Sequence, residues 1–191
     1  RRVLFRSPFV GVVLGISIAS TPAVMAQEAG GGSRSNVDLP RFPSISPDGS
    51  TVVFSWRGDL WRVSRDGGKA IRLTSHPARE HDSAWSPDGS RIVFESDRDG
   101  VTNLWSMTPD GTDIKRVTTF DTSVDLADVG VDADGRPWIA FTGSLEAEPV
   151  RETRPYEVPL AGGEPRRVHD AFGGSAVRSG DGRRVAFERG R

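Results

Sequence analysis

Few side chains in this chain of 191 residues could perform chemistry, and the histidines are the first to consider. Three are present: His76, His81 and His169. The first two lie close to Glu80 and Asp82, so a metal site is conceivable there. Their spacing matches no zinc signature, and the sequence therefore favours a solvated connector over a metal centre.

A second candidate for ion binding is the acidic segment 97–100, with the sequence Asp-Arg-Asp-Gly. It resembles the start of a calcium loop. The glutamate that a twelve-residue loop needs at its end is missing. The same residues form a good hairpin turn without any ion. The sequence thus predicts no metal ligands, no cofactor and no cofactor-binding residues.

Serine or cysteine catalysis has little support in the sequence. The chain has no cysteine, which excludes thiol nucleophiles, thiolate zinc sites and disulfides. No Gly-x-Ser-x-Gly motif occurs, and the nearest approach is Gly-Gly-Ser-Ala at 173–176. We expect that segment to lie in a connection between structural units. The sequence therefore predicts no catalytic residues in this chain.

Aromatic and charged residues could instead contact a peptide or a sugar. Stacking is one role open to the five tryptophans, which are Trp56, Trp61, Trp85, Trp105 and Trp138. Three of them recur at equivalent positions of a repeat, which favours packing between repeats. Connections between units are better places for peptide contact. By their position alone, the candidates for peptide contact are Arg79, Glu80, Arg151 and Glu152.

These side chains must be positioned by a repeated element. The segment 46–54, Ser-Pro-Asp-Gly-Ser-Thr-Val-Val-Phe, recurs at 86–94 as Ser-Pro-Asp-Gly-Ser-Arg-Ile-Val-Phe. Weaker copies follow at 134–141 and 181–187. A second block, with Leu-Trp, then Asp-Gly, then Thr, runs in step with the first. Copies in fixed register are the signature of a repeat architecture.

Each repeat has the chemistry of short antiparallel strands. Pro, Asp and Gly suit successive positions of a bulged hairpin turn. The runs that follow are too short for a helix and rich in β-branched and aromatic residues. Four short strands in each unit of roughly 40–47 residues is the period of a propeller blade. A β-sandwich is the competing fold, but it would not need copies in register.

We therefore predict an all-β fold, an incomplete β-propeller of four-stranded antiparallel blades with about three and a half blades present. The predicted boundaries are 38–80, 81–124 and 125–172 for the three full blades and 173–191 for the partial one. Closed propellers usually need four to eight blades. Alone, such a segment should dissolve poorly or associate, because an open blade face and strand edges stay uncovered.

The first 37 residues predict export. An apolar run at 9–19 is followed by Val-Met-Ala at 24–26, which is the pattern of a cleaved signal peptide over 1–26. The residues at 27–37 are typical of a flexible linker. Residues 1–7 also resemble a translated sequencing adapter, and we expect the reading frame to be clipped at both ends. The predicted location is periplasmic or secreted.

Charge excludes one class of partner. The chain carries 25 basic and 26 acidic residues, a balance that gives no electrostatic case for nucleic acid or an anionic membrane surface.

The repeats resemble a known group of propellers. The pattern Ser-Pro-Asp-Gly-Ser-x-Ile/Val-Val-Phe with a later Leu-Trp and Asp-Gly is similar to the repeats of TolB, the tricorn proteases and some prolyl-peptidase relatives. The opening segment 38–49 with 56–61 resembles the first blade of bacterial tricorn-like serine peptidases. The segments 142–146 and 154–173 resemble their third blade.

That resemblance implies a non-catalytic part of a larger enzyme. In the tricorn-like family, propellers precede a PDZ module and a C-terminal catalytic domain, and they filter or guide peptides and unfolded proteins toward it. None of the family's catalytic positions falls in this stretch. The implied partners are peptide substrates and the C-terminal domains of the same protein. The archaeal tricorn is cytosolic, so the predicted signal peptide departs from it. The alternative is a periplasmic interaction propeller of the TolB type, without enzymatic activity.

Overall fold

The computed structural model describes residues 39–145, 152–170 and 173–189, and the chain from Val37 onward forms one compact unit. The predicted signal peptide (1–26) and linker (27–37) lie outside the described residues, as does the peptide-contact candidate Arg151.

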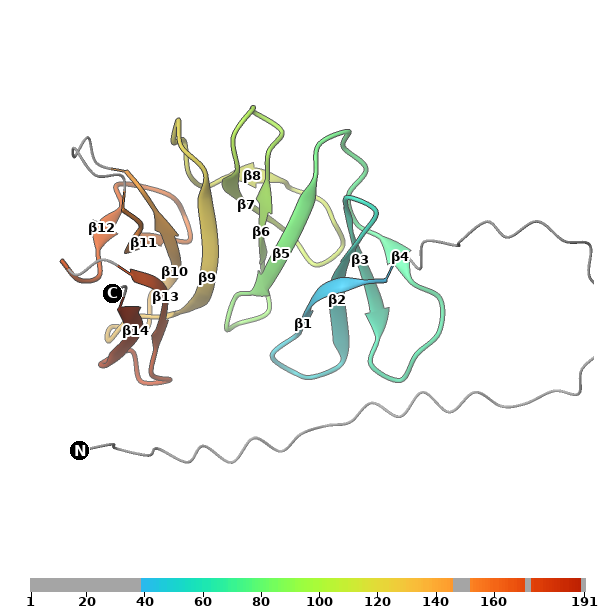
Figure 1. Ribbon diagram of the computed structural model, residues 1–191. Helices are drawn as coiled ribbons and strands as arrows, with labels where there is room; N and C mark the ends of the chain where they lie inside the picture. Colours follow the sequence, from blue (N-terminus) through green and yellow to red (C-terminus); the bar gives the residue numbers. More distant parts are fainter. Residues whose placement is uncertain (1–38, 146–151, 171–172, 190–191) are drawn as a thin grey trace, which may run out of the picture. The chain divides into compact units, whose positions relative to one another are not determined.

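Every regular element of the described residues is a β-strand, and the strands form successive antiparallel sheets (Figure 1). The first sheet contains β1 (Arg41–Ile45), β2 (Thr51–Trp56), β3 (Asp59–Ser64) and β4 (Ile71–Arg72). The second contains β5 (Glu80–Trp85), β6 (Ile92–Ser96), β7 (Asn103–Met107) and β8 (Lys115–Arg116). The third contains β9 (Val124–Val131), β10 (Pro137–Gly143), β11 (Arg154–Pro159) and β12 (Arg166–Arg167). The fourth has two strands, β13 (Gly173–Arg178) and β14 (Val185–Arg189). In each sheet the spatial order follows the chain order, which confirms the incomplete propeller of four-stranded blades.

The repeated Ser-Pro-Asp-Gly segment forms the hairpin turn between the first two strands of a sheet. In the first sheet, Ser46 Oγ donates to Asp48 Oδ1 at 2.6 Å and accepts from the Thr51 amide at 2.9 Å. The amide of Gly49, at φ 71°, donates to Ser46 O at 2.8 Å. The copy at 86–91 repeats these bonds at the same lengths within 0.1 Å. Serine and aspartate side chains therefore replace the ladder bonds that the turn interrupts.

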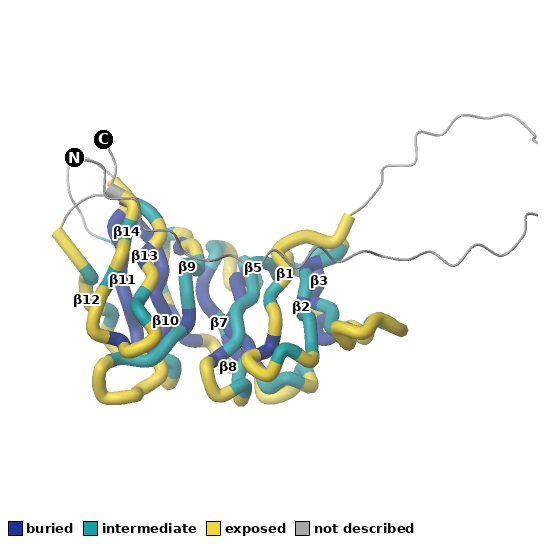
Figure 2. Tube along the Cα trace, turned by 90° about the horizontal axis from the view of Figure 1, so that it is seen from below, coloured by how far each residue is buried: buried dark blue, intermediate teal, exposed yellow. Residues whose placement is uncertain are grey.

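Apolar side chains pack between neighbouring sheets. Along β6, Ile92 and Phe94 face the first sheet and Val93 faces the third, and all three are fully buried. Three apolar clusters result, one at each of the three junctions between successive sheets. Figure 2 shows that the buried segments lie within the strands and that most of the loops are exposed. Burial on both faces explains why these strands are continuous apolar runs.

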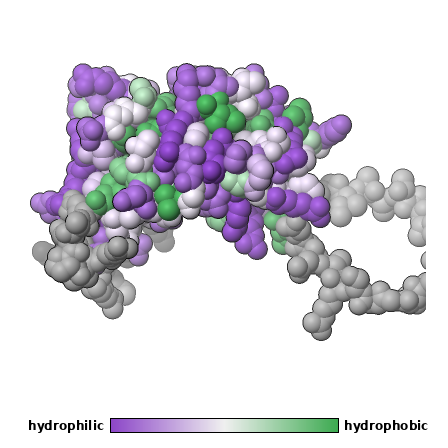
Figure 3. Space-filling view, turned by 90° about the horizontal axis from the view of Figure 1, so that it is seen from above, coloured by the Kyte–Doolittle hydropathy of each residue, from purple (hydrophilic) through white to green (hydrophobic). Residues whose placement is uncertain are grey.

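The face of the molecule drawn in Figure 3 is mostly hydrophilic with small apolar patches. Most of the large exposed apolar side chains belong to the first sheet or directly precede it: Leu39, Phe42, Ile45 and Ile71. Among the described residues there is no helix that could cross a membrane.

Candidate binding site on the first strands

The first strands of the four sheets lie side by side, so that β1 contacts β5, β5 contacts β9 and β9 contacts β13. A hydrogen bond of 2.9 Å between Ser44 Oγ and Ser83 Oγ joins β1 to β5. In a propeller the innermost strands surround the central channel. This wall of first strands is therefore the surface that a ligand entering the channel would meet.

A bulge interrupts each first strand near its middle. The pairing register shifts at this point in all four sheets. In three of them a residue other than glycine adopts a positive φ: Phe42 at 51°, Asp82 at 43° and Ser175 at 42°. Such backbone costs free energy, and bulges of this kind redirect side chains at functional positions. The bulges let neighbouring residues of one strand point to the same side.

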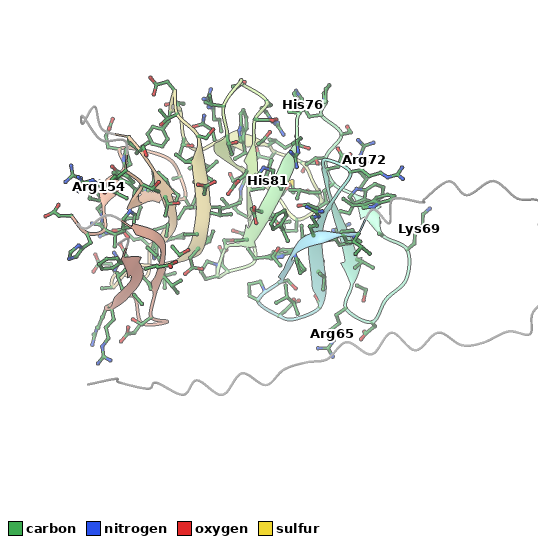
Figure 4. The ribbon with its side chains drawn as sticks, in the orientation of Figure 1. Arg65, Lys69, Arg72, His76, His81 and Arg154 are labelled. Atoms are coloured by element: carbon green, nitrogen blue, oxygen red, sulfur yellow. The ribbon has the colours of Figure 1, made fainter. Side chains whose placement is uncertain are left out.

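At the bulge of β5, three metal-ligating side chains meet. His81 Nδ1 lies 3.2 Å from Asp82 Oδ2 and 3.1 Å from Oε2 of Glu95, which is on β6. The exposed fractions of the three side chains are 27%, 37% and 3%, respectively. The Leu126 amide on β9 donates to Glu95 Oε1 at 2.5 Å. Figure 4 shows His81 on β5, in the midst of the sheets. The cluster is closed at Glu95 and reachable from solvent at Asp82.

A cavity of about 390 Å³ lies beside this cluster, between β1 and β5. Its lining includes Arg41, Phe42, Arg57, Arg79, His81 and Asp82. Guanidinium groups, the carboxylate of Asp82 and an aromatic ring thus border one space, which suits the mixed chemistry of a peptide.

Burial raises the pKa of three carboxyl groups in the first two strands of the sheets. It raises the pKa of Glu95 to about 8 against the Leu126 hydrogen bond, and the nearby charges of Asp82 and Asp125 add to the rise. Burial also raises the pKa of Asp128, although the amide of Val129 opposes the change. Burial raises the pKa of Glu80 too, against hydrogen bonds and the charge of Arg98.

The interpretation of His81, Glu80 and Asp82 as connector residues is wrong, because all three belong to β5. Glu80 is fully buried and paired with Arg98 at 2.9 Å, so it is not available for peptide contact. His76 does lie in the exposed connection that precedes β5 (Figure 4). The sequence did not reveal that these residues belong to a strand, because the first strand of each blade lies before the segment that repeats clearly.

The structure also places the other residues that the sequence had suggested for peptide contact, ion binding or catalysis. Arg79, Glu152 and His169 are exposed. The turn at 97–100 uses its carboxylates internally: Asp97 Oδ1 accepts from the Arg79 amide at 2.8 Å, and Asp99 pairs with Arg116 at 2.7 Å. The segment 173–176 lies in β13, so the prediction that it forms a connection is wrong.

The packing role of the repeated tryptophans is confirmed for two of them. Trp85 and Trp105 pack against the cluster between the first two sheets, and Arg98 stacks over Trp105 at 4.5 Å. Trp138 belongs to the cluster between the third and fourth sheets. Trp61 contacts Trp56 edge to face at 5.3 Å within its own sheet.

Sequence reasoning missed Glu95. The residue ends the apolar run Ile92–Phe94 in the middle strand of a blade, where a charged side chain is unexpected. Its counterpart in the first repeat is the neutral Ser55. A carboxylate in an otherwise apolar central strand is the signal that could have pointed to it.

Comparison with known proteins places these features in a family. Residues 37–191 match the model of the tricorn protease N-terminal β-propeller domain. Tricorn protease homolog 1 of Streptomyces coelicolor is 30% identical over 123 residues, which are 64% of this chain and 11% of that protein. The Tol-Pal system protein TolB of Anaeromyxobacter dehalogenans is 33% identical over 112 residues, 54% of this chain and 25% of that protein. The chain therefore spans a quarter or less of these relatives.

Solved structures show the same fold. The tricorn protease superposes with a TM-score of 0.61 at 21% identity, over 74% of this chain and 14% of that one. A putative TolB from Agrobacterium tumefaciens superposes with a TM-score of 0.59 at 24% identity, over 73% and 53% of the two chains.

Proposed function

The chain belongs to the family of tricorn protease N-terminal β-propeller domains, and from this membership we propose that it is the non-catalytic entry module of an exported tricorn-like serine protease. In this role it filters peptides and unfolded proteins and guides them to a catalytic domain elsewhere in the same protein. The family match over 37–191 is the observation that carries the proposal.

The wall of first strands supports a peptide-guiding role. Its cavity combines Phe42 with the arginines named above and the carboxylate of Asp82, so it offers partners to both ends and to the side chains of an extended peptide. The bulged strands β1 and β5 each contribute two consecutive residues to its lining, Arg41 with Phe42 and His81 with Asp82. Such a surface favours any peptide segment that is unfolded enough to reach it, rather than one particular peptide sequence.

The test begins with the complete gene. We expect the full-length protein to contain a PDZ module and a serine-peptidase region. A variant lacking the propeller should cleave a short chromogenic peptide at an unchanged kcat/KM. It should lose the wild-type preference for an unfolded protein over the same protein folded. A full-length protein without a peptidase region, or an unchanged preference, would refute the proposal.

Export needs its own measurement. Fusing residues 1–37 to alkaline phosphatase should give periplasmic enzyme activity, and deleting the apolar run at 9–19 should abolish it. A fusion that is made but stays inactive in the cytoplasm, where the disulfides of alkaline phosphatase do not form, would exclude the exported location while leaving the entry role open.

A second function is supported by the TolB relatives. The TolB of Anaeromyxobacter dehalogenans is 33% identical in its matched region, against 30% for the tricorn protease homolog. The chain would then belong to a protein-interaction propeller without a peptidase partner. A complete gene that ends after a closed ring of blades would favour this function.

A further inference from the structure

We propose that His81, Asp82 and Glu95 form a binding site for one divalent transition-metal ion, preferentially Zn²⁺. One atom from each side chain is available, and the three atoms lie within 4.8 Å of one another. One imidazole nitrogen and two carboxylate oxygens are a donor set that zinc accepts well.

The two distances from the histidine to the carboxylates fit a shared metal ion. Donor atoms about 2 Å from a tetrahedral zinc ion stand roughly 3.3 Å apart. His81 Nδ1 is 3.2 Å from Asp82 Oδ2 and 3.1 Å from Glu95 Oε2. The Leu126 amide holds Oε1 of Glu95, which leaves Oε2 directed at the histidine. Little rearrangement would be needed for the three side chains to share an ion.

The bulge explains how two consecutive residues reach the same point. Along a regular strand, neighbouring side chains point to opposite faces. Asp82 has φ 43°, and the register of β5 against β6 shifts after His81. The distorted backbone therefore brings His81 and Asp82 together in front of Glu95.

The other blades show that the fold does not require these residues. Strand pairing identifies the three equivalent positions in each sheet. They hold Arg41, Phe42 and Ser55 in the first sheet, Asp125, Leu126 and Thr142 in the third, and Gly174, Ser175 and Glu188 in the fourth. Only the second sheet places three metal-ligating side chains there. A neutral hydroxyl suffices at the position of Glu95 in two neighbouring sheets, so the carboxylate needs a separate explanation.

Burial and access are also those of a ligand site. The side chain of Glu95 is 3% exposed, and within the described residues only His81 and the Leu126 amide form an ion pair or hydrogen bond with its carboxylate. A buried carboxylate without a strong cationic partner is costly, and a bound cation removes that cost. His81 and Asp82 border the cavity between β1 and β5, which gives the ion a path in and leaves room for water as a fourth ligand.

The test measures zinc binding to the chain of 191 residues after treatment with a chelator. Equilibrium dialysis should show one Zn²⁺ bound per chain, with a thermal midpoint that rises as zinc is added. Glu95→Ser, which copies the residue of the first sheet, should weaken binding at least tenfold. Asp82→Asn, a change at a partly exposed side chain, should do the same without affecting the fold. His76→Asn is the matched control, because His76 lies in the nearby connection, and its affinity should equal that of the wild type.

Co²⁺ provides an independent readout of the donor set. The wild-type chain loaded with Co²⁺ should show visible d–d absorption, and Glu95→Ser should lose it. The proposal is overturned if the wild type binds no Zn²⁺ at about 100 µM, a concentration far above the Kd of typical protein zinc sites. It is equally overturned if Glu95→Ser and Asp82→Asn, both folded by circular dichroism, bind within twofold of the wild type.

Discussion

At the scale of single residues, the aspartates of the hairpin turns link stability to pH. Hydrogen bonds from Ser46 and Ser50 lower the pKa of Asp48 to about 2, and those from Thr108 and Thr112 lower the pKa of Asp110 to about 2. In the folded chain, hydrogen bonds therefore stabilise each ionised carboxylate, and the unfolded chain lacks these bonds. The resulting stabilisation is complete above the ordinary pKa of 3.8 and is lost as the pH falls toward 2.

Replacing Asp48 by Asn tests this linkage. The urea midpoint of Asp48→Asn should lie below that of the wild type at pH 5, and the two should converge between pH 4 and pH 2. Asp66→Asn, at an exposed turn of the same sheet, serves as the control and should follow the wild type over the whole range. A difference between Asp48→Asn and the wild type that is as large at pH 2 as at pH 5 would contradict the role assigned to the charge.

Thr118 supports a second prediction at this scale. Its Oγ1 accepts from the buried Leu104 amide at 2.9 Å and donates to Asn103 Oδ1 at 2.9 Å. Thr118→Val keeps the shape but leaves both groups without this partner. The free energy of unfolding should fall by about 1–3 kcal/mol. Thr119→Val, at the exposed neighbouring position, should change it by less than about 0.5 kcal/mol in the same urea titration.

At the scale of elements, one pair of glycines separates turn strain from packing between sheets. Gly67 and Gly111 occupy the same hairpin turn in the first and second sheets, at φ 90° and 86°. A Cβ at Gly67 would meet nothing within 4 Å, whereas one at Gly111 would lie 2.6 Å from the carbonyl oxygen of Leu73 in the first sheet. Gly67→Ala should cost about 1 kcal/mol for its backbone alone.

Gly111→Ala should cost about 1–3 kcal/mol more, because the hairpin must move away from the first sheet. Urea unfolding of both variants measures the difference. Equal losses of unfolding free energy in the two variants would mean that the hairpin at Gly111 does not pack closely against the first sheet.

One buried ion pair helps to attach the fourth sheet, beside the apolar cluster that joins it to the third. Glu157 on β11 is 5% exposed, and Arg178 on β13 binds both of its carboxylate oxygens, the closer contact being 2.7 Å. Arg166 also pairs with Glu157, but its side chain is 67% exposed. Removing one partner of a buried pair leaves the other charge uncompensated, at a cost of several kcal/mol when burial is complete.

Arg178→Gln should therefore loosen β13 and β14. Trypsin should cleave at the exposed Arg183 and Arg184 at least tenfold faster than in the wild type. Arg166→Gln, which removes only the exposed partner, should change the rate by less than threefold. Similar rates in the two variants would show that the pair does not hold the sheet.

At the scale of the whole molecule, the sequence predicted the repeated parts and missed what differs between them. The Ser-Pro-Asp-Gly turns and the apolar strands were predictable because turn chemistry and burial are local properties. The meeting of His81, Asp82 and Glu95 was not, because it needs a positive φ at an aspartate and the pairing of two strands. Neither leaves a pattern in neighbouring residues. Fixed spacing also favoured assigning Glu80 to a connection, although its backbone pairs with Ser96 and makes it part of β5.

The first sheet has one face without a neighbour among the described residues, and this predicts self-association. Phe94 and Ile92 of the second sheet are fully buried against the first, whereas their counterparts Phe54 and Val52 are only half-buried. Their apolar surface resembles that at the other junctions, so a second copy of the chain can cover it.

Sedimentation velocity should therefore show association that increases with concentration. Phe54→Ser should weaken it at least tenfold, because a buried phenylalanine contributes about 1.5–3 kcal/mol to such contacts. The same change at Phe94 creates a cavity with an unpaired hydroxyl at the junction of two sheets and should unfold the chain instead. A wild-type chain that stays monomeric, or a Phe54→Ser variant that associates as strongly, would mean that this face is covered in another way.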